Sequence, residues 1–491
     1  MTLICNTPPH RRLFVQWACF FVYAFVLLMW LSPDSFLVPT WSPRDDSSWF
    51  FTCGKAWMEG MTPYVDFSDS KGLLLWLIYG LGYLLSPDTY LGVFWLSVLA
   101  YTVTFFFIWR FARLFCCRRE AVVVLISMSL LLFFRQLHDE VRAEDFCLPW
   151  ICVGLFCSVR AMQSPTNNAL RHYAFFLGMG MAWCLLIKWN LFFMMGGMAL
   201  LVAGISYRQR YLSAIFFGLL GMTVVALPFV VYLFVQGNFD DMVREYFVNT
   251  FLITDNGSGC EMWKSFLVNN VTHIPTTLKT LVLCSILAGM VMFCKRRNFS
   301  YWLVLTYLPF FIFLELKAPW RYYTETAVPF FAFLLVLVVP RCSGRLLRIS
   351  GRQYALAMSL FYVGCIAVNV HVGRLSFFTV PRPARLTYVE QILKCHPYCK
   401  IMYAGHDVGW GLRARALPAC KYWALQNGAS QVMRDERALA IRERKPDFFL
   451  GNPTSPEEER LLLSNGYRQC QVDLVENGIR QKKPLPLYVR R

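Results

Sequence analysis

Long apolar segments separated by short basic clusters constrain this chain more than any other feature of its sequence. Runs such as residues 13–31, 211–235 and 354–370 approach twenty residues, the length that an α-helix needs to cross a bilayer. Only 16% of the 491 residues are Asp, Glu, Lys or Arg, and 57% are hydrophobic, whereas a soluble domain carries about a quarter charged residues. The sequence therefore predicts a membrane protein that crosses the bilayer many times.

The basic clusters predict the direction of each crossing, because short loops rich in Lys and Arg stay on the cytoplasmic side. If Arg11 and Arg12 are cytoplasmic, all later short basic clusters are cytoplasmic too, provided that the short apolar segment 73–85 is interfacial or re-entrant. The clusters also account for the net charge of +18, so no nucleic-acid partner is predicted. Eleven spans result: about 13–32, 89–109, 121–135, 146–160, 173–187, 189–206, 211–235, 274–294, 300–314, 326–340 and 354–373.

The chain becomes polar after about residue 373. Short apolar stretches at 400–404 and 447–450 alternate with helical patterns at 386–393, 434–444 and 456–463, as in a small α/β domain. We therefore predict an α-helical polytopic membrane domain, 1–373, followed by a non-cytoplasmic α/β domain, 374–491. A disulfide between Cys395 and Cys399 is one alternative for the only close cysteine pair in this domain.

Acidic residues of the membrane portion gather in the predicted non-cytoplasmic loops. A carboxylate at a membrane boundary is costly unless it has a partner, a water-filled cavity or a function, and it can serve as a general base. The purely structural alternatives are that an acid caps a helix or interacts favourably with the dipole at its N-terminus. The acids are Asp45, Asp46, Glu59, Asp66 and Asp69 in the first loop and Asp139, Glu140, Glu144 and Asp145 in the second.

Isolated cations occupy the same predicted face. Lys188 interrupts an almost unbroken apolar stretch, where snorkelling of the side chain is the simplest explanation. Arg321, next to Tyr322, is suited to bidentate contact with phosphate. Acids and cations on one face fit a lipid-phosphate donor, because a carboxylate activates an acceptor hydroxyl while cations stabilise the departing phosphate. No nucleotide-binding fingerprint or metal-ligand spacing is present.

The first loop carries the most specific motif, Asp46-Ser-Ser-Trp-Phe followed by Gly60-Met-Thr-Pro-Tyr-Val-Asp66-Phe-Ser-Asp69-Ser-Lys71-Gly72. It resembles the first external loop of GT-C glycosyltransferases, above all the bacterial relatives of protein O-mannosyltransferases and of the lipid A aminoarabinose transferase. Residues 142–149 and 320–329 are similar to two later loops of that family. A Lys-Gly pair replaces the usual Pro-Pro, and a common histidine of the late loop is absent.

The resemblance implies an inverting glycosyltransferase that moves a sugar from a polyprenyl-phosphate carrier to a hydroxyl of a glycan, lipid or protein. Asp46 is the implied catalytic carboxylate, with Asp45 as the alternative and Glu144 or Asp139 assisting. No cofactor is predicted with certainty, and a divalent cation stays an open alternative because GT-C enzymes differ in metal use. The implied ligands of phosphate or substrate are Lys188, Arg321, Lys71, Tyr322, Asp66 and Asp69.

Two other classes of function fit the sequence less well. A transporter or flippase would be built from repeated halves with broken helices at mid-membrane, and the sequence shows no internal repeat. A non-enzymatic membrane scaffold would leave Lys188 and the first-loop motif unexplained. The resemblance favours a bacterial inner membrane, with the active site facing the periplasm or exterior.

Overall fold

The computed structural model divides the chain into two compact units. Unit 1 comprises Met1–Ser32, Ser97–Pro228 and Gly257–Leu375, and unit 2 comprises Pro33–Leu96, Phe229–Asn256 and Ser376–Arg491. The structure describes residues 9–32, 35, 45–133, 141–249, 274–316, 321–346, 388–405, 408–409, 415–425, 430–472, 475–476, 479–480 and 485–490.

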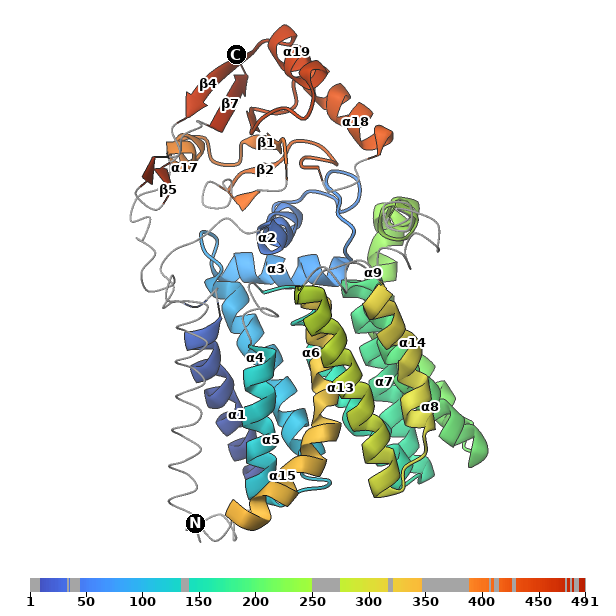
Figure 1. Ribbon diagram of the computed structural model, residues 1–491. Helices are drawn as coiled ribbons and strands as arrows, with labels where there is room; N and C mark the ends of the chain where they lie inside the picture. The colour runs from blue at the N-terminus through green and yellow to red at the C-terminus, as the bar shows by residue number, and fades with distance from the viewer. Residues whose placement is uncertain are drawn as a thin grey trace. The chain divides into compact units, whose positions relative to one another are not determined.

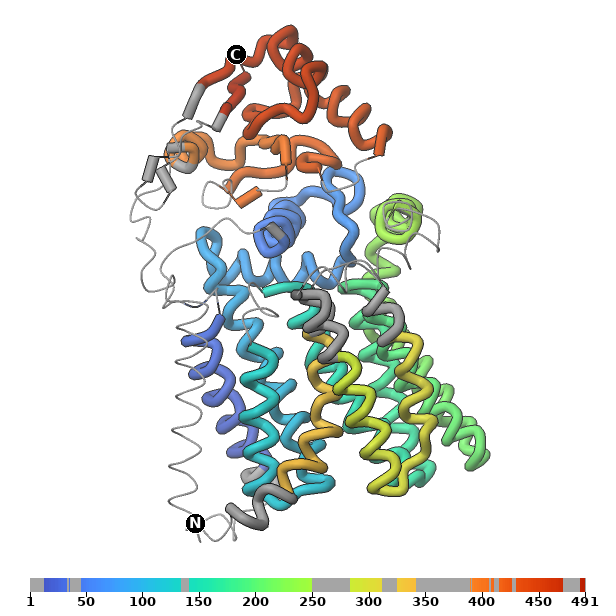
Figure 2. Tube along the Cα trace, in the orientation of Figure 1, coloured from blue at the N-terminus to red at the C-terminus, as the bar shows by residue number. Residues whose placement is uncertain are grey.

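Unit 1 is a bundle of apolar helices (Figures 1 and 2). Within it α6, α7 and α8 pack together, α14 packs on α8, and α15 packs on α5 and α13. The helices are α1 (Pro9–Leu31), α5 (Arg118–Leu132), α6 (Leu148–Gln163), α7 (Asn167–Ile187), α8 (Trp189–Arg208), α13 (Ile274–Arg297), α14 (Trp302–Leu316), the 3-10 helix η3 (Arg321–Phe331), α15 (Ala332–Leu346), and most of α4 (Leu91–Ala112) and α9 (Ser213–Gln236).

Five helices in the described residues are long and apolar enough to cross a membrane. They are Leu13–Leu31, Leu91–Ala112, Asn167–Ile187, Trp189–Arg208 and Ser213–Gln236, and each coincides with a predicted span. The helices α5, α6, α13, α14 and α15 lie where five further spans were predicted. The predicted span 354–373 lies outside the described residues, so the total of eleven stays a prediction.

Small residues bring several unit 1 helices into backbone contact. A Cβ atom added to Gly221 of α9 would lie 2.1 Å from the carbonyl oxygen of Phe175 in α7. One added to Gly197 of α8 would lie 2.5 Å from the carbonyl oxygen of Thr306 in α14. Such contacts are a main source of helix association in lipid, where the hydrophobic effect contributes little.

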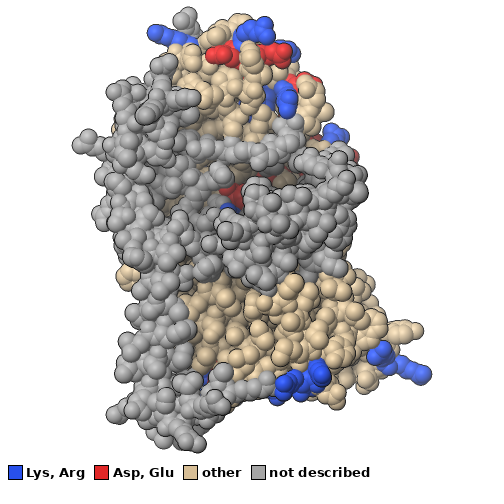
Figure 3. Space-filling model, viewed as in Figure 1, with Lys and Arg blue, Asp and Glu red and all other residues tan. Residues whose placement is uncertain are grey.

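One end of unit 1, called the basic end below, gathers the cations that punctuate the apolar segments. It is defined by the last turns of α4, α6, α8 and α13 and the first turn of α5, which carry Arg110, Arg160, Arg208, Arg297 and Arg118. Figure 3 shows Lys and Arg at this end, and Glu120 of α5 is an acid within these turns. The excess of cations is the one that the positive-inside rule describes.

Unit 2 contains two short helices of the first loop, α2 (Asp45–Met58) and α3 (Leu73–Leu85). They pack so closely that a Cβ on Gly54 would lie 2.4 Å from the backbone nitrogen of Gly80. The 13 residues of α3 extend only about 20 Å, less than the hydrocarbon core of a bilayer. This length agrees with the predicted interfacial or re-entrant helix. Unit 2 also includes α10 (Phe239–Met242) and the π-helix η2 (Val243–Val248).

The C-terminal part of unit 2 forms a five-stranded sheet of order β2-β1-β3-β7-β4. The strands β2, β1 and β3 are parallel to one another, and β7 runs antiparallel to both of its neighbours, β3 and β4. The predicted strands at 400–404 and 447–450 correspond to β1 and β3, and the small α/β fold is confirmed. Cys395 and Cys399 are free thiols, so the disulfide alternative was wrong. The elements are α17 (Tyr388–Lys394), β1 (Lys400–Tyr403), β2 (Leu417–Pro418), α18 (Gln431–Arg442), β3 (Phe448–Leu450), α19 (Pro456–Ser464), β4 (Tyr467–Val472), the hairpin β5 (Val475–Glu476) and β6 (Ile479–Arg480), and β7 (Leu485–Arg490).

Candidate functional site

Lys188 is the single residue between α7 and α8, and its extended backbone (φ −155°, ψ 107°) breaks what would otherwise be one long helix. Its amide donates to the carbonyl oxygen of Cys184 (2.7 Å), and its own carbonyl accepts from Leu191 (2.9 Å). The neighbouring helices therefore hold the Lys188 backbone in place from both sides. This junction lies at the end of unit 1 opposite the basic end.

The Lys188 ammonium forms an ion pair with Glu144, at 2.5 Å between Nζ and Oε1. Only 8% of the lysine side chain and 1% of the glutamate side chain are exposed. Lys188 therefore does not snorkel to solvent. Glu144, four residues before α6, pairs with the Lys188 ammonium in addition to any effect on a helix N-terminus. A buried pair of this kind is a costly arrangement, so its presence calls for a partner or a task.

Two further buried carboxylates lie in the same unit, around the hydroxyl of Tyr101 on α4. This hydroxyl contacts Asp145 Oδ1 at 2.5 Å and Glu325 Oε1 at 3.2 Å, and both carboxylates are buried. The other oxygen of Asp145 accepts from the backbone amide of Arg142 at 2.7 Å. The loop before α6 and the 3-10 helix η3 are thereby held on α4.

In unit 2, α2 begins with the acidic pair of the first-loop motif. Asp46 is half-buried in the first turn, and Asp45 starts the helix, although its side chain lies outside the described part. Ser48 and Tyr90 share a buried hydrogen bond of 2.8 Å, which ties the first turn of α2 to the residue before α4. The predicted catalytic carboxylate thus has a rigid helical support.

The other first-loop candidates have different surroundings. Asp66 is exposed and accepts from the backbone amide of Thr62 at 2.7 Å, an arrangement that closes a turn. Asp69 is buried and accepts from the amide of Ser70 at 2.6 Å. Lys71 donates to Ser70 Oγ at 3.2 Å and lies over the ring of Phe50.

Within unit 2 the C-terminal part is attached to the first loop through Glu245 of η2. This buried carboxylate accepts from Ser68 Oγ (3.2 Å) and from the Tyr422 hydroxyl (2.8 Å), and it pairs with Lys421 (3.1 Å). The backbone adds a bond of 3.0 Å from the Ser68 amide to the Lys421 carbonyl. Three segments far apart in sequence are thereby fixed to one another.

Lys55 on α2 is a buried cation that the sequence analysis did not single out. Its side chain is 0% exposed, and its ammonium has no hydrogen-bond partner among the described residues. Burial lowers the pKa of Lys55 to about 7, although Cys399, Glu59 and Asp88 act in the opposite direction. The folded chain therefore favours the neutral amine more strongly than an exposed lysine does.

Some predicted site residues lie outside the described part of the chain. Asp139 does so entirely, while Arg321 and Tyr322 lie in η3 with side chains that are not described. Among the described residues, no group of three or more His, Cys, Asp or Glu is arranged to hold a metal ion. The roles of Asp139, Arg321 and Tyr322 therefore stay predictions.

Sequence reasoning missed Tyr101, Glu325, Glu245 and Lys55 as buried polar residues. Glu325 does lie in the segment 320–329 that resembles a GT-C loop, so this segment was the one available signal. Tyr101 is one of several hydroxyl-bearing residues of the apolar helix α4, and no local pattern distinguishes it from Ser97, Thr102 or Thr104. Asp145, Glu144 and Lys188 were recognised from their positions, but their partners were not.

No protein-family model matches the sequence, and no curated protein matches it. Two solved structures are similar to it over nearly their whole length. Both are of the lipid A aminoarabinose transferase ArnT from Cupriavidus metallidurans. The form bound to undecaprenyl phosphate has a TM-score of 0.60 at 13% identity, covering 96% of this chain and 97% of that one. The apo form has a TM-score of 0.58 at 14% identity, covering 96% and 98%. The protein therefore has the GT-C fold of an integral membrane protein, as its first-loop motif implied.

Proposed function

We propose that this protein is a glycosyltransferase that moves a sugar from a polyprenyl-phosphate carrier to an acceptor hydroxyl. The observation that carries the proposal is the likeness of the whole fold to ArnT, one form of which binds undecaprenyl phosphate. The buried Lys188–Glu144 pair supports it, because a desolvated cation is suited to stabilising a phosphate that gains charge as it leaves.

The proposed reaction is a single displacement with inversion at the anomeric carbon. The acceptor oxygen forms the new bond to this carbon, and the bond from the carbon to the phosphate oxygen breaks. Asp46, or its neighbour Asp45, takes the proton of the acceptor hydroxyl, and the polyprenyl phosphate leaves with both electrons of the broken bond. We assign Lys188 to the leaving phosphate and Glu144 to positioning Lys188. Arg321, Tyr322 and Lys71 are further candidate ligands of phosphate.

The proposed side of the membrane follows from unit 1 alone. Lys188, Glu144 and Asp145 lie at the end of the bundle opposite the basic end, and the positive-inside rule makes the basic end cytoplasmic. The chemistry would then occur on the non-cytoplasmic face. A bacterial inner membrane, with the reaction at its periplasmic face, is the setting that we propose.

Donor turnover tests the proposed reaction. Purified protein in nanodiscs is incubated with radiolabelled polyprenyl-phosphate sugars and a membrane lipid extract, and sugar released from the carrier is measured. Wild type should transfer sugar and Asp46→Asn should not, because an amide cannot accept the proton. Asp88→Asn is the matched control: Asp88 is an exposed acid in a surface pair with Arg415, so transfer should persist.

The same assay distinguishes the alternatives. Activity in a folded Asp46→Asn variant, together with loss in Asp45→Asn, would move the catalytic role to Asp45. Activity in both single variants would refute the carboxylate assignment. Binding of the carrier lipid without any release of sugar, across the donors and acceptors supplied, would contradict the transferase and favour a carrier-lipid transporter.

A further inference from the structure

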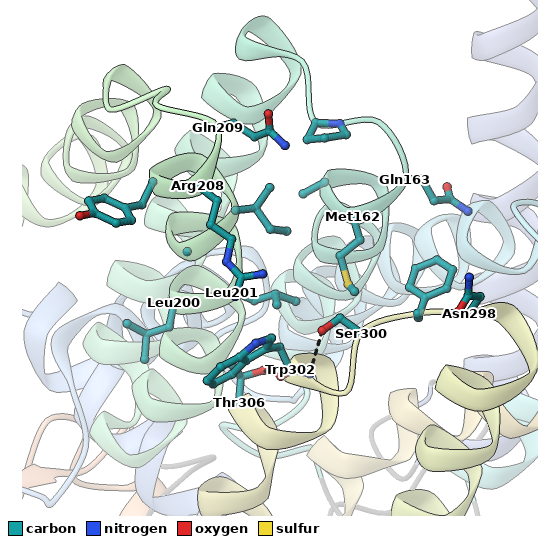
Figure 4. A pocket seen from close by; sticks show the side chains of 16 residues that line it. Met162, Gln163, Leu200, Leu201, Arg208, Gln209, Asn298, Ser300, Trp302 and Thr306 are labelled. Carbon is teal, nitrogen blue, oxygen red and sulfur yellow. Dashed lines mark hydrogen bonds between the residues drawn. The ribbon is translucent and has the colours of Figure 1, made fainter.

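A cavity of about 710 Å³ lies at the basic end of unit 1, between the ends of α6 and α8 and the beginning of α14 (Figure 4). Its volume falls within the range of small-molecule sites. Arg208 lines it, whereas Lys188 lies 20 residues earlier at the other end of α8. About 30 Å of helix, at 1.5 Å per residue, separate the two side chains. The cavity is therefore distinct from the candidate functional site.

The polar part of the cavity lining is suited to a singly charged anion. Arg208 is the only charged residue that lines it, and in Figure 4 its guanidinium points inward. Within the described part of the chain no carboxylate pairs with Arg208. Four side chains with neutral donors line the same cavity, those of Gln163, Gln209, Asn298 and Trp302. A guanidinium with neutral donors matches the geometry of a phosphodiester.

Much of the remaining lining is apolar, and part of it is exposed on the surface of the bundle. Leu200, Leu201 and Ile205 belong to it, and an exposed Trp302 stands at its edge. Tryptophan is enriched at the boundary between lipid and water. Gly204 leaves the wall open, because a Cβ added there would meet nothing within 4 Å. Next to the lining residue Thr306, α8 and α14 touch at Gly197. A lining that combines one cation and neutral donors with apolar side chains fits an amphipathic ligand.

We propose that this cavity binds one anionic phospholipid from the leaflet at the basic end. The phosphodiester lies on Arg208 and its neutral neighbours, and an acyl chain lies along Leu200, Leu201 and Ile205. Zwitterionic lipids are disfavoured because their own ammonium would lie at an end of the bundle that carries Arg208 and, two and three residues before the lining residue Asn298, the cations Arg296 and Lys295. A polyprenyl phosphate, a monoester with nearly two negative charges, is poorly matched to a cavity with one cation.

Native mass spectrometry of the purified full-length chain tests this proposal. The probes are phosphatidylglycerol and phosphatidylethanolamine with identical acyl chains, and undecaprenyl phosphate. Arg208→Gln removes the charge, and Gly204→Leu fills the cleft. Arg118→Gln, at the basic end in the first turn of α5 but outside the cavity, is the charge control. Gly196→Leu is the cavity control, since it lies on α8, does not line the cavity, and an added Cβ there also meets nothing within 4 Å.

Wild type should hold one phosphatidylglycerol in preference to phosphatidylethanolamine. Arg208→Gln should weaken this binding by about fivefold or more, the factor that one basic residue contributes toward an anionic lipid at a membrane surface. Gly204→Leu should abolish it, and both controls should bind as wild type does. Equal binding of the two phospholipids would overturn the proposal. So would wild-type binding by Arg208→Gln, or preferential occupation by undecaprenyl phosphate, which would mark a carrier-lipid site instead.

Discussion

Separating the structural from the chemical role of Lys188 is the sharpest test of the unit 1 site. Three variants are needed: Lys188→Met, Glu144→Gln, and the two substitutions combined. Lys188→Met leaves Glu144 buried and unpaired, since only 1% of its side chain is exposed. Breaking a buried pair in this way costs about 3–5 kcal/mol, whereas replacing both charges by neutral groups is often close to neutral.

The double variant should therefore recover most of the stability that Lys188→Met loses. Reversible unfolding in mixed detergent, followed by tryptophan fluorescence, measures both free energies and their coupling. The surface pair Arg415–Asp88 is the matched control, with an N–O distance of 3.6 Å and side chains 39% and 51% exposed. Arg415→Met should cost no more than about 1 kcal/mol.

Donor turnover by the same variants separates two roles. If Lys188 contacts the leaving phosphate, the double variant is stable but inactive. If Lys188 only neutralises Glu144, the double variant regains both stability and activity, and the proposed phosphate contact is refuted. A loss below about 1 kcal/mol in Lys188→Met would instead show that the pair is solvated, because surface pairs contribute this little.

Two further predictions concern other parts of the chain. Because burial lowers the pKa of Lys55 to about 7 from about 10.4 in the unfolded chain, the unfolded state binds more protons between these values. The stability of wild type relative to Lys55→Met should therefore rise with pH above 7, by up to about 1.4 kcal/mol per unit. A difference in unfolding free energy that does not vary between pH 7 and pH 9 contradicts the buried amine, since the linkage requires a slope there. Gly221→Ala places a Cβ 2.1 Å from the Phe175 carbonyl and should lower the unfolding free energy by about 1–3 kcal/mol through overpacking. Gly196→Ala, with open space around its Cβ, is the control, and equal stability of the two variants would contradict the close contact of α7 and α9.

The sequence alone determined the class of the protein and the places of most elements. Apolar length is a local property, so α1, α7, α8 and α9 could be located from single segments. The basic clusters, together with the shortness of residues 73–85, predicted that α3 is interfacial or re-entrant. Short apolar runs between helical patterns located β1 and β3 in the C-terminal region. The first-loop motif indicated the GT-C fold because its order and spacing are specific, and the structural likeness confirmed that fold.

Only the tertiary structure decided which polar residues meet. Glu144 pairs with Lys188 across 44 positions, and Glu245 meets Ser68 and Tyr422 across 177 positions in each direction. Such contacts depend on helix packing and side-chain direction, which no periodicity within a single segment records. The cavity at Arg208 is also a tertiary feature, because α8 and α14 touch at Gly197 and leave the space beyond it open toward the basic end. Hydrophobicity acts on each segment by itself, whereas a site requires several segments to converge.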